Sequence, residues 1–165
     1  SGAKLSVGAS DDLVFPGDFT IEAFFRSDSS ASNASIFSVN IGAGAGGFEL
    51  YCRRGSGNSL QFQYFNGSGY PNISDTNYTD FNDSVWRHLA VCRSATTLML
   101  FVGGVKIVEG YAGVTLGVAG QPLIIGGSNY ASSPFSGHVD EVRVTKGVAR
   151  YTANFTPPTA PFPNS

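Results

Sequence analysis

The chain has 165 residues, which is enough for one domain with a sizeable hydrophobic core and no disulfide staples. Charged residues make up only 13% of it and the net charge is −2, so we expect neither nucleic acid nor an anionic membrane as a partner. No apolar run approaches the ~20 residues of a transmembrane helix, so no membrane insertion is expected. The chain starts at Ser1 without an initiator methionine, which indicates a processed product or a piece of a longer protein.

The first half of the chain reads as short strands separated by polar turns. Residues 18–27 are the clearest case, because apolar side chains occupy alternate positions from Phe19 to Phe25. Pro16 and Gly17 place a turn directly before this strand. The strands expected in this half are residues 4–7, 18–27, 35–40, 48–53 and 60–65. The glycine run at 42–47 (GAGAGG) leads into a strand rather than a helix, so we interpret it as a hairpin loop and not as a phosphate-binding loop.

The central stretch, residues 86–106 (WRHLAVCRSATTLMLFVGGVK), predicts two antiparallel strands joined by a polar turn at 94–96. In the first strand Leu89 and Val91 point one way, while His88, Ala90 and Cys92 point the other. The glycine pair at 103–104 ends the second strand, and a further strand follows at 105–109.

The remainder of the chain continues this pattern. Strands are expected at residues 121–126 and 135–145, followed by a single turn at 148–151 and an extended proline-rich tail at 155–165. With many glycines and aromatic residues and little helical periodicity, the sequence predicts an all-β fold, one domain over residues 1–165. We expect about 11–13 strands in a two-sheet antiparallel β-sandwich, with minimal helix.

Five ordered motifs carry a resemblance to a known family. They are DFTIEAFF (18–25), WRHLAVCR (86–93), LMLFVGG (98–104), LIIGG (123–127) and FSGHVDEVRVTKGVARY (135–151). Together they resemble a laminin-G-like domain of the concanavalin A-like lectin/glucanase jelly rolls. The ending GVARYTANFTPPTAPF (147–162) is similar to versions found in bacteriophage virion and tail proteins and in bacterial surface proteins. The resemblance implies glycan binding, protein binding, adhesion or virion structure, and fold alone does not decide among them.

Catalysis is not expected. Related glucanases use closely spaced carboxylates on one strand, and retaining chemistry needs two carboxyl groups roughly 5 Å apart. The adjacent pair here, Asp140 and Glu141, should point to opposite faces of a strand. Glu22 and Glu49 stand alone in their strands, so we predict that the protein is not an enzyme.

The strand carboxylates have structural interpretations instead. Glu22 and Glu141 would pair with nearby arginines such as Arg26 or Arg143 on the polar sheet face. Asp140 shares its alternation with the apolar positions 142 and 144, so we expect it to point into the core, hydrogen-bonded to backbone or holding a cation.

Metal sites are weakly indicated. His88 and His138 lack a second histidine or cysteine at ligand spacing, which argues against zinc. Calcium, which several laminin-G-like relatives bind through loop oxygens, would draw on Asp75, Asp80 and Asp83. The alternative is a solvated acidic loop without metal.

Sugar binding usually combines an exposed aromatic ring with Asn or Asp side chains on loops. Two loops offer this combination, an irregular region at 66–84 and a shorter one at 127–134. The candidate glycan-binding residues are Tyr70, Asn72, Asn77, Tyr78, Asn129 and Tyr130. We assign Trp86 to core packing. Cys52 and Cys92 are expected as free thiols, with one disulfide as the alternative.

The sequence thus favours a non-catalytic recognition module that binds carbohydrate, carried on a phage virion or a bacterial surface protein. The alternative is a structural decoration module that docks on another virion protein without sugar. The expected partners are a cell-surface glycan or a virion protein, with homo-oligomers formed through the parent assembly. Either reading places the domain on a virion surface or outside the cell.

Overall fold

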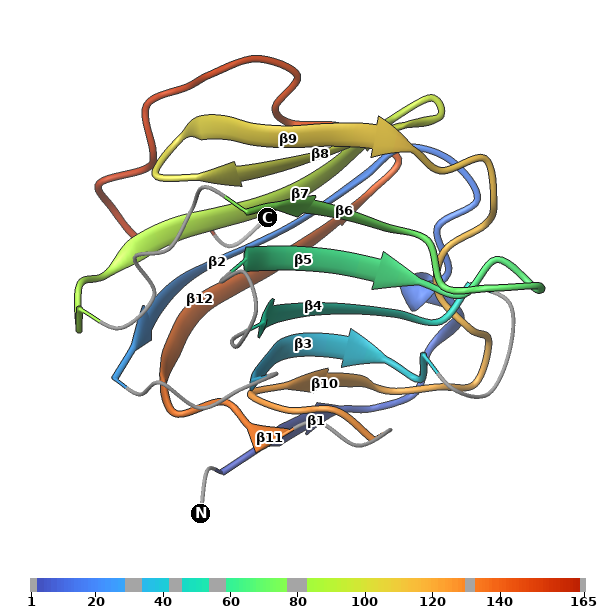
Figure 1. Cartoon of the computed structure of the whole chain (residues 1–165), viewed down its shortest axis with the longest axis horizontal. Helices are drawn as coiled ribbons and strands as arrows, with labels where there is room; N and C mark the ends of the chain where they lie inside the picture. Colours follow the sequence, from blue (N-terminus) through green and yellow to red (C-terminus); the bar gives the residue numbers. More distant parts are fainter. Residues whose placement is uncertain are drawn as a thin grey trace.

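The computed structural model describes residues 3–28, 34–41, 46–53, 59–76, 83–129 and 133–163. This part of the chain forms twelve strands and one short 3₁₀ turn, η1 (Asp11–Leu13). The strands make two sheets packed face to face, a β-sandwich (Figure 1). The predicted fold class and strand number are therefore confirmed. Within the described part, no helix is long and apolar enough to cross a membrane.

Each sheet has its own strand order. The seven-stranded sheet contains, in spatial order, β1 (Leu5–Val7), β10 (Leu123–Ile125), β3 (Ala34–Val39), β4 (Phe48–Arg53), β5 (Ser59–Tyr64) and β6 (Asn72–Asp75), with β11 (Ser133–Pro134) beside β3. The five-stranded sheet contains, in spatial order, β12 (Gly137–Lys146), β2 (Phe19–Ser27), β7 (Arg87–Ser94), β8 (Thr97–Val102) and β9 (Val105–Tyr111). All pairings are antiparallel except the two-residue contact of β11 with β3.

The core lies between the sheets and follows the alternation of the sequence. Phe19, Ile21 and Phe25 of β2 are almost completely buried in it, together with Leu89 and Val91 of β7. Removing apolar surface from water at about 25 cal/mol per Å² is the main force that holds the two sheets together. The predicted facing of β2 and β7 is therefore confirmed.

The two central hairpins form as predicted. Ala95 and Thr96 make the turn between β7 and β8, and Gly103 and Gly104 make the turn between β8 and β9. Both glycines have positive φ, +57° and +81°, which suits the tight turns that match the twist of antiparallel strands.

A second, smaller apolar cluster lies on the outer face of the five-stranded sheet. Ala90, Cys92, Met99 and Phe101 point outward there, and the C-terminal tail (residues 147–163) covers them with Tyr151 and Phe155. In Figure 1 this tail is the red trace that follows β12. The tail is extended as predicted, but residues 148–151 contain a bend at Arg150 instead of the predicted turn.

Three expectations from the sequence are wrong. The region 66–84, expected to be irregular, contains the strand β6. Only Ile73 of this strand is buried, so its sequence shows no alternation of apolar and polar residues that would have predicted a strand. Asp140 is exposed rather than in the core, because a bulge at Glu141 (φ +51°) reverses the alternation between Val139 and Val144. Trp86 is not packed in the core but is 44% exposed.

Candidate functional site

The structure brings two of the six glycan candidates together. Asn72 pairs with Gln63 across β5 and β6, and the Gln63 side-chain amide donates to the Tyr70 carbonyl oxygen over 3.3 Å. Asn77, Tyr78 and Tyr130 lie outside the described residues. Asn129 is exposed and follows Ser128, whose carbonyl oxygen accepts a hydrogen bond from Lys4. Asn129 therefore lies near strands β1 and β10, at the opposite edge of the seven-stranded sheet from β6.

Tyr70 is displayed on a well-ordered turn. Its side chain is 42% exposed, and its ring centroid lies 4.9 Å from that of Phe65. The Asn66 side-chain oxygen accepts hydrogen bonds from the backbone amides of Ser68 and Gly69, which fixes the turn between the two rings. An exposed aromatic ring on a fixed turn is the kind of surface on which a sugar ring stacks.

The outer face of the seven-stranded sheet is polar. The strand registers align the outward residues into two lateral rows, which are Ser35–Tyr51–Gln61–Ser74 and Ser38–Glu49–Gln63–Asn72. Hydroxyl, amide and carboxylate groups thus stand side by side at the ~4.8 Å strand spacing.

Hydrogen bonds tie part of this face together. The Tyr51 hydroxyl donates to Gln61 Oε1 over 2.6 Å, and Gln61 Nε2 donates to Ser59 Oγ over 3.1 Å. Ser35 Oγ is fully buried and has no hydrogen-bond partner among the described residues, which is unusual because such a group costs about 1–3 kcal/mol. The sequence analysis did not single out this polar face. The alternation of Tyr51, Ser59 and Gln61 with the core residues Leu50, Leu60 and Phe62 could have shown that they lie on the outer face.

The acidic residues proposed for calcium do not form a cation site among the described residues. No group of three or more acidic, histidine or cysteine side chains is positioned to hold a metal there, and Asp80 lies outside the described part. Asp83 is bound by Arg87, whose Nη1 donates to Oδ1 over 2.7 Å. Hydrogen bonds from Arg87 lower the pKa of Asp83 to about 2. Asp75, at the end of β6, pairs with Leu60.

A second aromatic surface lies where β2 ends and β7 and β12 begin. Trp86 stands next to His138, with ring centroids 6.1 Å apart, and the Arg26 guanidinium carbon lies 5.8 Å from the Trp86 ring centroid. Asp28 forms an ion pair with Arg26, and its Oδ2 also lies 3.2 Å from His138 Nδ1. The sequence did not indicate this surface, because Trp86 directly precedes the mostly buried strand β7 and was therefore assigned to the core.

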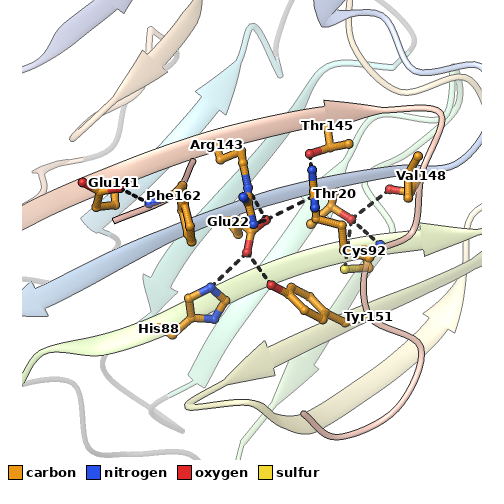
Figure 2. Close-up of polar contacts among 11 residues, drawn as sticks. Thr20, Glu22, His88, Cys92, Glu141, Arg143, Thr145, Val148, Tyr151 and Phe162 are labelled. Atoms are coloured by element: carbon orange, nitrogen blue, oxygen red, sulfur yellow. Dashed lines mark hydrogen bonds and ion pairs between the residues drawn. The ribbon is translucent and has the colours of Figure 1, made fainter. Parts of the chain in front are cut away.

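Glu22 is the centre of a buried polar network under the C-terminal tail (Figure 2). Its carboxylate accepts hydrogen bonds from His88 Nε2 at 3.1 Å, Arg143 Nε at 2.8 Å and the Tyr151 hydroxyl at 2.9 Å. Arg150 Nε lies 3.7 Å from the same carboxylate. The predicted pairing of Glu22 with Arg143 is confirmed, whereas Glu141 accepts instead from the backbone amide of Phe162 in the tail.

The pKa shifts in this network follow from its hydrogen bonds. Burial by itself would raise the pKa of Glu22, but the hydrogen bonds from His88, Arg143 and Tyr151 outweigh it and leave the pKa below its ordinary value. Burial, with the hydrogen bond to Glu22, raises the pKa of Tyr151 to about 12. Glu22 is thus held ionised, which is the opposite of a general acid in glycoside hydrolysis.

The geometry also argues against a carboxylate pair at Glu22. Its side chain has no exposed surface, and all its hydrogen-bond partners are donors. Within the described ranges, no second carboxylate takes part in the network. The arrangement therefore stabilises the fold and binds the tail to the sheet.

An apolar pocket of about 820 Å³ opens between the sheets at their β1–β12 edge. Its walls are mainly aliphatic, and they include Leu5, Val7, Leu123, Ile125, Val139 and Val144. Leu5 and Val7 remain 62% and 41% exposed. Such a lining offers few hydrogen-bonding groups for a sugar but suits an apolar contact.

Cys52 and Cys92 are both buried thiols that are not joined in a disulfide, as predicted. Cys52 lies in the main core and Cys92 lies under the C-terminal tail, so the two thiols belong to different layers of the molecule. The disulfide alternative is wrong for this structure.

Several solved structures share this fold. Domains LG4-5 of the mouse laminin α1 chain match with a TM-score of 0.67 and 22% identity, over 88% of this chain and 39% of that one. Domain 4 of the arabinanase AbnA from Geobacillus stearothermophilus, in complex with arabinotriose, matches with a TM-score of 0.65 and 14% identity, over 89% and 77%. The Ruminococcus gnavus sialidase CBM40 bound to α2,3-sialyllactose matches with a TM-score of 0.61 and 17% identity, over 86% and 90%.

These low identities establish a shared fold, and this chain spans less than half of the laminin fragment. No curated protein matches the sequence. A family model described as the concanavalin A-like lectin/glucanases superfamily matches residues 1–150, which is most of the chain. With its two-sheet sandwich and the five ordered motifs, the chain belongs to this superfamily, as one of its laminin-G-like domains.

Proposed function

We propose that this domain is a non-catalytic carbohydrate-binding module, carried on a phage virion or a bacterial surface protein and acting outside the cell. Structural neighbours from carbohydrate-active proteins support the sugar-binding part, because two of them are described in complex with a glycan. The resemblance of residues 147–162 to phage and bacterial surface proteins supports the carriage.

The observation that carries the proposal is the surface formed by Tyr70, Gln63 and Asn72. The exposed Tyr70 ring supplies an apolar face for the C–H groups of a sugar. Asn72 is exposed on the outer face of β6 and Gln63 is half-buried beside it on β5, so both amides can bond hydroxyl groups as donor and acceptor. One aromatic ring with two amides on a rigid sheet edge is a minimal sugar subsite.

A glycan array probed with the purified domain tests this function directly. We expect selective binding, weakened about tenfold or more by Tyr70→Ala and less by Asn72→Ala. Tyr111→Ala is the matched control, because this tyrosine is 73% exposed but belongs to the five-stranded sheet. No binding by a folded sample would overturn the proposal. Loss with Tyr111→Ala alone would overturn the site.

Calcium is tested in the same experiment by adding EDTA. Loss of binding in EDTA, restored by calcium, would support a site that includes Asp75, Asp80 and Asp83 and that draws Asp83 away from Arg87. Unchanged binding would remove calcium from the proposal.

One observation favours the alternative, a structural module that docks on another virion protein. Leu5 and Val7 on the edge strand β1 are exposed beside the apolar pocket, and a partner segment could cover them. Self-association or binding to a virion protein, lost in a Leu5→Asp variant and accompanied by no glycan binding, would favour this alternative.

A further inference from the structure

The ends of β2, β7 and β12 carry an exposed cluster that the Tyr70 surface does not include. We propose that Trp86, Arg26, Asp28 and His138 form a second sugar-binding site, which takes an uncharged monosaccharide unit with adjacent hydroxyl groups. This inference rests on the proposed carbohydrate-binding function and adds a second binding site to it.

Trp86 supplies the stacking surface. Its side chain is 44% exposed and lies just before β7, so it is held by the strand that follows. Arg26 and His138 approach its ring, at 5.8 Å and 6.1 Å. The electron-rich ring face attracts the weakly positive C–H groups of a pyranose or furanose, as it attracts the guanidinium.

Three polar side chains stand beside the ring. Arg26 Nη2 donates to Asp28 Oδ2 over 3.3 Å, and His138 Nδ1 lies 3.2 Å from the same oxygen. Arg26 Nε lies 3.0 Å from Asp28 Oδ1 but has no aligned hydrogen bond. All three side chains keep exposed surface, 31% for Arg26, 31% for Asp28 and 57% for His138. A guanidinium next to a carboxylate offers a donor and an acceptor to two neighbouring hydroxyl groups.

The charges favour a neutral sugar. Arg26 is balanced by Asp28, and the nearby Arg87 is balanced by Asp83. A carboxylate-bearing sugar would compete with Asp28 for the Arg26 guanidinium and would meet two acidic side chains. The hydroxyl groups of a neutral sugar carry no charge, so they would not compete with Asp28 for the Arg26 guanidinium in this way.

The cluster is built on a rigid frame. The Ser84 amide donates to the Ser27 carbonyl, and the Asp28 amide donates to the Ser136 carbonyl, so the three strand ends are tied together. Gly137 allows this close approach, because a Cβ there would lie 2.0 Å from the Arg26 carbonyl oxygen. A backbone held in this way loses little entropy when a ligand binds.

The new site is separate from Tyr70. A chain of contacts connects the far end of β7 to the Tyr70 turn. The Arg93 side chain donates to the Phe15 carbonyl, and Phe15 pairs with Leu116. The Gly117 amide donates to Gly46 and the Gly46 amide to Phe65, whose ring packs beside Tyr70. Trp86 precedes the opposite end of β7, whose eight residues span about 23 Å at ~3.3 Å per residue. The two aromatic surfaces therefore lie at opposite ends of the sandwich, and one domain could hold two glycan chains.

Trp86 is the only tryptophan of the chain, so its fluorescence reports on this site alone. The wild-type domain would be titrated with an uncharged oligosaccharide that binds on the array, and emission and acrylamide quenching would be recorded. We expect an emission shift and protection from quenching. We also expect about tenfold weaker binding at this second site in Trp86→Ala and in Asp28→Ala, with binding at the Tyr70 surface unchanged, measured by calorimetry on folded variants. Glu109→Ala, an exposed carboxylate of β9, is the matched control.

The outcomes separate the two proposals. If the wild-type domain binds glycan while Trp86 emission stays unchanged and Trp86→Ala binds normally, the second site is overturned and the carbohydrate-binding function stands. Binding of carboxylate-bearing glycans alone would overturn the assignment to an uncharged sugar. Absence of glycan binding in any folded sample would overturn both.

Discussion

At the scale of single residues, alternation predicts which face a side chain occupies but not its partners. The sequence placed Glu22 on the outer face of β2 and suggested Arg26 or Arg143 as its partner; the partner is Arg143, whereas Arg26 binds Asp28. The other donors, His88 and Tyr151, were not predicted, because alternation does not show which strand lies beside β2 or where the C-terminal tail crosses the sheet. Asp140 was misplaced because a single bulge shifts every later side chain to the other face.

Glu22→Gln should destabilise the domain by about 2–4 kcal/mol, because Arg143 and the other donors lose a buried charged acceptor. Urea denaturation at pH 7 measures the effect. Glu109→Gln is the control, since its pair with Lys106 is exposed and should contribute less than about 1 kcal/mol. Equal stability of the two variants would contradict the role assigned to Glu22.

The pH dependence of the unfolding free energy, compared between wild type and Glu22→Gln, gives a second test. The pKa of Glu22 is lowered in the folded state, so its ionised form stabilises the fold above the ordinary value of 4.5 and this contribution is lost as pH falls through the folded pKa. Glu22→Gln does not titrate. The difference in unfolding free energy between wild type and variant should therefore narrow below pH 4.5, and a constant difference down to pH 2 would contradict the shift.

At the scale of elements, strands with a clear run or alternation of apolar residues were predictable, and β6, which has neither, was not. Residues 48–53 and the central hairpins were located almost to the residue. β6 was missed because Asn72, Ser74 and Asp75 look like loop residues, and only pairing with β5 makes them a strand. The tail was predicted as extended, but its packing on the sheet depends on Tyr151 and Phe155, whose rings stack at 3.5 Å.

The β8–β9 turn offers a matched pair of variants for the tail. Both turn glycines have positive φ, so Ala at either position should cost about 1–2 kcal/mol. A Cβ at Gly104 would also lie 2.0 Å from the Phe155 carbonyl oxygen, whereas one at Gly103 meets nothing within 4 Å. Gly104→Ala should therefore destabilise the domain more than Gly103→Ala in urea denaturation. Equal losses would show that the tail is not held by this turn.

At the scale of the whole molecule, the two thiols lie in layers that can open separately. Cys92 is covered by the tail, and burial raises its thiol pKa, while Cys52 is enclosed between the sheets. In single-cysteine variants, Cys92 should react with DTNB through local opening, with a weak dependence on urea, and Cys52 only through global unfolding. Identical urea dependence of the two rates would show that the tail detaches only when the whole domain unfolds.

The pairing of β2 with β12 also has a consequence for synthesis on the ribosome. Phe19 to Ser27 pair with residues 137–146, so one edge of a central strand stays open until those residues have been synthesised. Contacts this distant in sequence slow folding, and an open apolar strand edge is prone to aggregation. The sandwich of the nascent domain therefore cannot close before residues 137–146 have left the ribosome.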